Sequence, residues 1–261
     1  MIKSNPFIIS CLLLFSIVLM QYCAIGQENR INRVDSIGRK QGQWKKFDEE
    51  GHLKYDGSFK DNIPIGEFKY FYSSGKIKAI SKYSNNGKIS YTITYHPDGV
   101  TKMGEGKFVN EKKDSLWHYY NDQNKLISEE YYKLGKKNGL TKNYYPGSKV
   151  DEEISFRDDL KEGDWIRYYP DGAPKMKSKY ISDLLQGLTQ FYYPSGKVMV
   201  SGIYKNSIKD GVWMYFDEIG KTQKKEIYKD GHLIKEEIFD KSIIEKENTD
   251  TILPEKINKF K

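Results

Sequence analysis

Aromatic and glycine positions recur along the chain at a nearly fixed spacing. A segment of the form Gly-x-Trp/Phe-x-x-aromatic begins at Gly42 and returns in similar form seven times. The eight starts are Gly42, Gly66, Ser90, Ser115, Gly139, Gly163, Gly187 and Gly211. Six of the seven intervals are 24 residues long, and the interval from Ser90 to Ser115 is 25. A period of this length predicts a repeat array rather than a compact globular fold.

Aromatic residues recur at three places within each repeat, which we number from its starting residue. All four tryptophans of the chain occupy the third position: Trp44, Trp117, Trp165 and Trp213. The sixth position is aromatic in every repeat: Phe47, Phe71, Tyr95, Tyr120, Tyr144, Tyr168, Tyr192 and Phe216. Another aromatic follows late in the repeat: Phe59, Tyr83, Phe108, Tyr132, Phe156, Tyr180, Tyr204 and Tyr228. Phe108 is one place late, so the extra residue of the third repeat lies upstream of it.

A glycine turn separates the two aromatic stretches. The tenth position is glycine in six repeats: Gly51, Gly75, Gly99, Gly172, Gly196 and Gly220. The fourth repeat has Asn124 there and the fifth has Gly147 one place early, and both residue types tolerate positive φ. Because aromatic residues favour extended backbone, each repeat is predicted to be strand, turn, strand and loop, which is one β-hairpin.

The predicted fold is therefore an all-β, elongated antiparallel array of about eight β-hairpin repeats over residues 42–239. One hairpin is marginal alone, so aromatic ladders between neighbours should supply the stability. Residues 27–41 form a lead-in segment and N-terminal cap, and residues 240–261 form a charged tail that is expected to be disordered. The third repeat, with Ser90, Thr92 and Thr94 in place of glycine and aromatics, should be the weakest part of the sheet.

These repeats resemble the MORN repeat, in particular the variant found in bacterial proteins labelled YwqK-family antitoxins. The matching stretches are Gly-Glu-Phe-Lys-Tyr-Phe-Tyr-Ser-Ser-Gly-Lys (66–76), Gly-Asp-Trp-Ile-Arg-Tyr-Tyr-Pro-Asp-Gly (163–172) and Gly-Val-Trp-Met-Tyr-Phe-Asp-Glu-Ile-Gly-Lys (211–221). The resemblance covers about residues 34–239. It implies the hairpin fold, and an antitoxin role through the YwqK label, but such repeats serve many functions.

The first 26 residues differ from the rest of the chain and resemble a secretory signal peptide. Lys3 precedes an apolar run from Pro6 to Met20, and small residues before Gln27 suit cleavage after Gly26. Export to the periplasm or the extracellular space is therefore expected. Lipidation of Cys23 is the alternative, which the bulky Tyr22 before it disfavours. Both cysteines lie in this leader, so the mature chain would have no disulfide.

The chain has a formal net charge of +7, which leaves two interpretations open. A basic edge would suit anionic lipid or another anionic partner. Lysines that keep a large sheet soluble are the alternative, and the interspersed acidic residues favour it. Export makes nucleic acid an unfavoured partner.

No pattern of catalytic or metal-binding residues accompanies the repeats. His52, His96, His118 and His232 occupy four different phases of the period, so nothing in their spacing brings two together. The sequence lacks a phosphate-binding loop, a nucleophile elbow and a zinc-protease motif. Acidic pairs such as Asp158-Asp159 fall between hairpins, where solvated side chains are commoner than catalytic ones. We therefore expect no enzyme activity, no metal and no cofactor.

Tyrosines at variable positions form the candidate partner surface. Positions five and seven should face away from the sixth position, because side chains alternate along a strand. The recurrent sixth position is expected to supply the packing, which leaves its neighbours freer to contact a partner. The candidates are Tyr70, Tyr119, Phe191 and Tyr215 at position five and Tyr72, Tyr145, Tyr169 and Tyr193 at position seven. The alternative is that they simply cover the second face of the sheet.

The function expected from these features is that of a secreted, non-enzymatic repeat protein that binds a protein partner or acts as a scaffold. Peripheral membrane or envelope association is one alternative, suggested by the basic charge and by the expansion of the MORN name, membrane occupation and recognition nexus. An antitoxin-like role is another, although neutralising a cytoplasmic toxin would conflict with a signal peptide. A carbohydrate hydrolase is disfavoured because a single-layer array provides no evident cleft.

Overall fold

The computed structural model describes residues 31–240, and its regular elements there are all β-strands. They fall into two compact units. Of the described residues, the first unit holds those up to Ser90 together with Pro97–Gly99, and the second holds Tyr91–His96 and those from Val100 onward. The predicted leader (1–26), the start of the lead-in segment and the tail beyond residue 240 lie outside the described residues.

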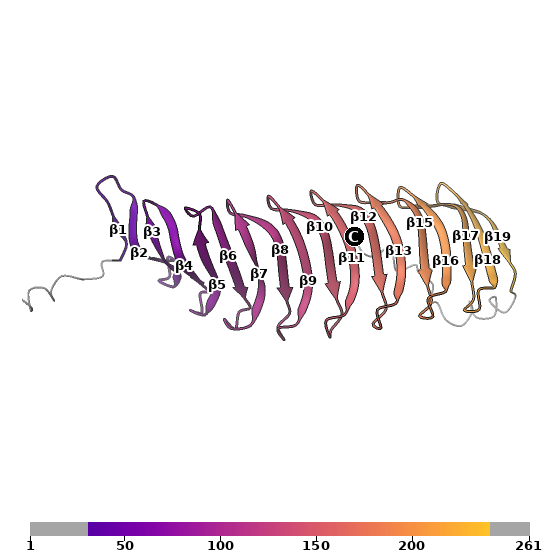
Figure 1. The fold of residues 1–261 in the computed structure, drawn as a ribbon, viewed down its shortest axis with the longest axis horizontal. Helices are drawn as coiled ribbons and strands as arrows, with labels where there is room; N and C mark the ends of the chain where they lie inside the picture. Colours follow the sequence, from indigo (N-terminus) through magenta and orange to yellow (C-terminus); the bar gives the residue numbers. More distant parts are fainter. Residues whose placement is uncertain (1–30, 241–261) are drawn as a thin grey trace, which may run out of the picture. The chain divides into compact units, whose positions relative to one another are not determined.

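Successive strands of the first unit pair in antiparallel fashion, each with the next in the chain (Figure 1). These strands are β1 (Arg33–Val34), β2 (Lys40–Phe47), β3 (Leu53–Lys60), β4 (Ile63–Phe71) and β5 (Ile77–Ser84). The division between the units falls inside β6 (Ile89–Tyr95). This strand belongs to the third repeat, where the sequence departs most from the pattern.

The second unit continues in the same way, with antiparallel neighbours in chain order. Its strands are β7 (Lys102–Val109), β8 (Lys112–Tyr120), β9 (Leu126–Lys133), β10 (Lys136–Tyr144), β11 (Val150–Arg157), β12 (Leu160–Tyr168), β13 (Pro174–Ile181), β14 (Leu184–Leu185), β15 (Gly187–Tyr192), β16 (Val198–Lys205), β17 (Ile208–Phe216), β18 (Thr222–Lys229) and β19 (His232–Ile238). Strand β13 pairs with both β14 and β15. The prediction of an all-β array of antiparallel hairpins is confirmed.

The glycine turns lie where the sequence places them. In the second repeat the Tyr72 N–H donates to the Lys76 carbonyl at 2.9 Å, and Gly75 adopts a φ of 80°. In the third repeat the corresponding bond runs from the His96 N–H to the Thr101 carbonyl, which is one residue further along. The extra residue of this repeat is therefore accommodated in the turn.

Most links between consecutive hairpins are tight two-residue turns rather than the predicted loops, and the link at residues 85–88 is longer. Asp158 and Asp159, for example, have φ values of 51° and 75°, as in the type I′ turns that suit the twist of hairpins. This turn is bonded to the preceding repeat. The Asp159 N–H donates to the Lys137 carbonyl at 2.9 Å, and the Lys137 N–H donates to Asp159 Oδ1 at 2.7 Å. The acidic pair that the sequence suggested to be merely solvated therefore joins two repeats.

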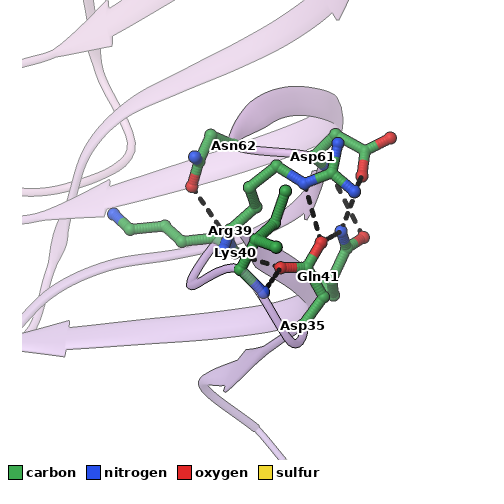
Figure 2. Close-up of polar contacts among 7 residues, drawn as sticks. Asp35, Arg39, Lys40, Gln41, Asp61 and Asn62 are labelled. Carbon is green, nitrogen blue, oxygen red and sulfur yellow. Dashed lines mark hydrogen bonds and ion pairs between the residues drawn. The ribbon is translucent and has the colours of Figure 1, made fainter.

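A turn side chain that accepts a backbone N–H also joins the lead-in segment to the first repeat (Figure 2). The Lys40 N–H donates to Asn62 Oδ1 at 2.8 Å, and the Arg39 guanidinium lies 2.7 Å from Asp35 and 2.9 Å from Asp61. The hydrogen bond from the Arg39 backbone N–H is the main reason why the pKa of Asp35 falls to about 2. Ionised Asp35 thus bridges the lead-in turn and the start of β2.

Each sheet has two unlike faces, because side chains alternate along every strand. On β13, Met176, Ser178 and Tyr180 are buried, whereas the side chains between them are exposed. We call the face that carries the third-position Trp or Phe the aromatic face, and the opposite face, which carries the sixth-position aromatics, the outer face. On the aromatic face of the second unit, Trp213 is 1% exposed and meets Tyr204 edge to face at 5.0 Å.

The core belongs to the aromatic face, so the expectation that the sixth position supplies the main packing is wrong. The buried hydrophobic residues are Phe68, Trp117, Ile154, Met176, Tyr180, Leu185, Phe191, Val200 and Trp213. None of them is at the sixth position, and Phe47 is 49% exposed. The third and fifth positions share a face, and the sixth position lies across the sheet from them.

Candidate functional site

The position-five candidates lie in the core. Phe191 is 8% exposed within a cluster that includes Val200 and Trp213, and Tyr215 packs against that cluster. Tyr119 stacks on Trp117 with ring centroids 6.2 Å apart. Tyr70 likewise stacks on Phe68 at 6.2 Å and shares a 2.9 Å hydrogen bond with the Tyr83 hydroxyl. These four side chains contribute to folding, and their role toward a partner stays a prediction.

The position-seven candidates form a ladder between repeats. The hydroxyl groups of Tyr145, Tyr169 and Tyr193 donate to the carbonyl oxygens of Tyr168, Tyr192 and Phe216 at 2.8, 2.7 and 2.8 Å. In each case the acceptor is the sixth residue of the next repeat. Burial raises the pKa of all three phenols. Tyr72, at the same position in the first unit, is half-buried and lies under the Lys78 ammonium at 5.8 Å.

Tyr169→Phe should lower the free energy of unfolding by about 1 kcal/mol, because one hydrogen bond between repeats is lost while the ring remains. The measurement is urea denaturation of the two proteins. Tyr131→Phe is the control, since the Tyr131 ring is 44% exposed on the outer face of β9. An equal loss in both variants would mean that the hydroxyl ladder does not link the repeats.

Sixth-position tyrosines make a second ladder on the outer face. The hydroxyl groups of Tyr120, Tyr144 and Tyr168 donate to Glu105, Glu129 and Glu153 of the preceding repeat at 2.7, 2.7 and 2.8 Å. Burial, followed by the hydrogen bond to Glu153, raises the pKa of Tyr168 to about 12. These glutamates are therefore held by the fold, and they do not converge on a cleft as paired catalytic carboxylates would.

A buried charged cluster lies near the end of the second unit. Glu226 and Lys224 are 6% and 8% exposed, and the Lys224 ammonium lies 2.9 Å from the Glu226 carboxylate. The hydroxyl groups of Tyr215 and Tyr228 also donate to Glu226. Burial by itself raises the pKa of Glu226, but these hydrogen bonds and the lysine outweigh it, so the net pKa lies below the usual range. The carboxylate thus stays ionised inside the aromatic face.

This cluster predicts a pH-dependent step in stability. Because the pKa of Glu226 is lower in the folded chain than the ordinary 4.5, the stabilisation is present above pH 4.5 and is lost as the pH falls through the folded pKa. Glu226→Gln should cost about 2 kcal/mol at pH 7 and flatten the acid limb of the curve. Urea unfolding at several pH values measures this. Glu218→Gln, in an exposed turn, is the control, and parallel curves for parent and Glu226→Gln would contradict the expectation.

One surface was missed by the sequence reasoning: a strip of exposed aliphatic side chains on the outer face, beside the type I′ turns. Its members are 43–56% exposed and lie on β12 to β17: Leu160, Ile181, Leu184, Leu188, Ile203, Ile208 and Val212. Cross-strand pairs join four of them, as Ile181 lies opposite Leu184 and Leu188 opposite Ile203. We call this surface the aliphatic strip. Contiguous exposed apolar side chains of this kind mark interaction sites more often than isolated ones do.

Comparison with protein families identifies the repeats. Four segments of the chain match the family described as MORN repeat variant: residues 40–61, 64–85, 161–181 and 185–206. The chain contains MORN repeats. No curated protein matches it.

The repeats that carry the aliphatic strip differ from the third and fourth repeats at one equivalent position. Leu160, Leu184 and Ile208 each follow a type I′ turn, where the third and fourth repeats have Lys112 and Lys136 and the first repeat has Ile63. The replacement of lysine by an aliphatic residue is a signal present in the sequence, but the recurrent positions alone do not reveal it.

One group of possible metal ligands lies at the glycine turn of the first MORN repeat. Oxygen or nitrogen atoms of Asp48, Glu50 and His52 lie within 4.8 Å of one another. The Asp48 carboxylate accepts the His52 backbone N–H at 2.7 Å, so it already serves the turn, and Glu50 and His52 are exposed. The expectation that no metal binds stays a prediction. Residues 31–240 contain no helix with the length and apolar character needed to cross a bilayer.

Proposed function

We propose that the chain is an exported, non-enzymatic repeat protein that binds a protein partner through the aliphatic strip and so acts as a scaffold. The observation that carries this proposal is the strip itself, since Leu188 and Ile203 are 56% and 47% exposed although they pair across two strands of an ordered sheet. The candidate tyrosines support it less. The hydroxyl groups of Tyr70, Tyr145, Tyr169 and Tyr193 already form hydrogen bonds within the chain.

An interface of this kind would use a few central apolar side chains for most of its affinity. Flanking polar groups would exclude water and contribute little each. Under the antitoxin-like role implied by the resemblance of the repeats to YwqK-family proteins, the partner would be an exported toxin. A membrane or envelope surface is the alternative occupant, and the two are separated by asking whether binding needs lipid.

The test compares a triple variant of the strip with a double control variant, both made in the chain from Gln27 onward. Leu188→Ser, Ile203→Ser and Val212→Ser together remove the centre of the strip. Ile63→Ser and Ile65→Ser form the control, because these side chains are 37% and 42% exposed on the outer face of the first unit. A partner captured from the envelope fraction, identified and purified should bind the strip variant at least about tenfold more weakly, as for loss of interface anchors. Unchanged binding, or capture only by liposomes, would contradict the proposal.

Export has its own test. N-terminal sequencing of the exported protein should begin at Gln27, because small residues precede the expected cut after Gly26. A lipid-modified Cys23 at the N-terminus would instead place the protein on a membrane as a lipoprotein.

A further inference from the structure

Three lysines follow one strand on the outer face beside the aliphatic strip. Lys175, Lys177 and Lys179 alternate with the buried side chains of β13, and all three are exposed. Successive members are two residues apart, which is about 6.6–6.8 Å along a strand. The next outward side chain on β13 is Ile181, which belongs to the aliphatic strip. We call these residues the lysine row.

The lysine row has no acidic partner among the described residues. None of the three ammonium groups forms an ion pair within residues 31–240, although many other lysines of the chain do, such as Lys142 with Glu153. Lys175 and Lys177 lie over the rings of Tyr169 and Tyr192 at 5.6 and 5.8 Å. These contacts position the side chains but leave their positive charge unneutralised.

The residues opposite the lysine row do not supply the missing charge. Lys177 lies opposite Ile166 on β12 and Gln190 on β15, both uncharged. Lys179 lies opposite Asp164, yet their charged groups do not come within ion-pair distance. Unpaired like charges on one strand repel one another, so the row is a cost to folding unless something else uses it.

The row also interrupts a periodic pattern. Position fifteen of the repeat holds Glu129 and Glu153 in the two preceding repeats, where each accepts a tyrosine hydroxyl. In the next repeat this position holds Lys177, and the Tyr192 hydroxyl donates instead to Gln190 at 3.0 Å. The charge reversal occurs in the repeat that contributes Ile181 to the aliphatic strip. Departure from the pattern and exposure of aliphatic side chains therefore coincide.

We propose that the lysine row and the aliphatic strip together bind an acidic amphipathic segment of a protein partner. This rests on the proposed function and specifies the chemistry of the partner. The strip crosses the strands whereas the row runs along β13, so the apolar side chains of the segment cover the strip and carboxylates along one edge of the segment reach the row from its Lys179 end. The strip spans four strand spacings of about 4.8 Å, roughly 19 Å, which matches a helix of about 13 residues.

A narrow segment suits this surface better than an anionic bilayer does. The outer face also presents Asp164 opposite Lys179 and Asp210 opposite Ile203. A planar anionic surface broad enough to cover the strip and the row would meet these carboxylates too. A segment that covers the strip and meets the row at one edge can leave the two aspartates outside its apolar contact, where they remain hydrated.

The test uses two synthetic amphipathic peptides of about 14 residues, one of Leu and Glu and one of Leu and Lys, each titrated into the chain from Gln27 onward. The Leu–Glu peptide should bind the parent about tenfold more tightly than the Leu–Lys peptide, because only it complements the row. The double variant Lys175→Glu/Lys179→Glu should lose about tenfold in affinity for the Leu–Glu peptide.

The matched control is Lys78→Glu/Lys82→Glu. These exposed lysines occupy the same two positions on β5 of the first unit, so the change in net charge is identical. Affinity within about twofold of the parent is expected, since screened charges at a distance contribute little. Equal losses in the two double variants would overturn the proposal, because net charge would then explain binding.

Two further outcomes separate this inference from the proposed function. If both peptides bind equally and binding is lost in the Leu188→Ser/Ile203→Ser/Val212→Ser variant, the strip binds a partner without selecting acidic residues, and the inference falls alone. If the Leu–Glu peptide does not bind, while vesicles of phosphatidylcholine with phosphatidylglycerol bind the parent and not Lys175→Glu/Lys179→Glu, the occupant is a bilayer and both proposals fall.

Discussion

Gly106→Ala should destabilise the second unit by about 3 kcal/mol, which is large for the addition of one methyl group. A Cβ at Gly106 would fall 2.4 Å from the ring of Trp117, which lies flat against the glycine and is 2% exposed. Neither group can move freely, because the Trp117 ring is also held by Phe108 at 4.9 Å and donates its N–H to the Lys107 carbonyl. The measurement is the free energy of unfolding in urea.

Gly104→Ala is the matched control on the same strand and the same face. Its Cβ would lie 3.1 Å from Tyr119 and 3.3 Å from the His118 carbonyl oxygen, so shifts of a few tenths of an ångström relieve these contacts and the cost should be under about 1 kcal/mol. A double variant sharpens the test. Adding Trp117→Val to Gly106→Ala should remove most of the clash, and the two costs should then be strongly non-additive. Equal costs for the two single alanine variants would show that ring contact with the glycine backbone does not constrain this position.

Truncation of an aromatic side chain should cost far more on the aromatic face of the sheet than on the outer face. Trp213→Ala should cost about 3–5 kcal/mol, in the range of large aromatic truncations in cores, because Trp213 is 1% exposed among Tyr204, Val200 and Phe191. Phe216→Ala, three residues along on β17, should cost clearly less, because this sixth-position ring lies half-buried on the outer face.

Chemical denaturation of the two variants tests whether the core lies on the aromatic face or on the outer face. If Phe216→Ala costs as much as Trp213→Ala, the outer face contributes to the core as strongly as the aromatic face does.

The period, the hairpin in each repeat and the glycine turns could be predicted because they depend on local signals. Gly75 marks a turn by its own backbone freedom, and the late placement of Phe108 located the extra residue upstream, in the turn between His96 and Thr101. Those inferences need only the order and spacing of residues along the chain. They do not depend on which side chains meet across strands.

The choice of core face could not be predicted by recurrence. The sixth position is always aromatic, yet Tyr144 and Tyr168 serve a hydrogen-bonded ladder to Glu129 and Glu153. Third-position residues vary between Trp, Phe and Thr, but they face the second-strand positions that include Gly106, whose lack of a side chain lets a large ring lie on the backbone. Burial depended on this complementarity between neighbouring strands.

The tight turns between hairpins were missed for a related reason. Asp158-Asp159 and Ser182-Asp183 lack the Asn-Gly or Asp-Gly signature of a type I′ turn. The side chain of the second turn residue instead accepts a backbone N–H from the preceding repeat, as Asp183 does from Lys161 at 2.8 Å. That bond joins residues 22 apart in sequence, so no local pattern could reveal it.

These bonds between adjacent repeats make the second unit a one-dimensional series with nearest-neighbour coupling. The turn bond joins residues 22 apart and the tyrosine bond joins residues 23 apart. Excision of a whole 24-residue period would rejoin both ladders in phase, whereas loss of one strand residue would invert every later side chain. The array can thus change length only in whole periods, except where a turn accommodates an extra residue. A sequence built by duplication of a whole period therefore keeps the strand register in each copy.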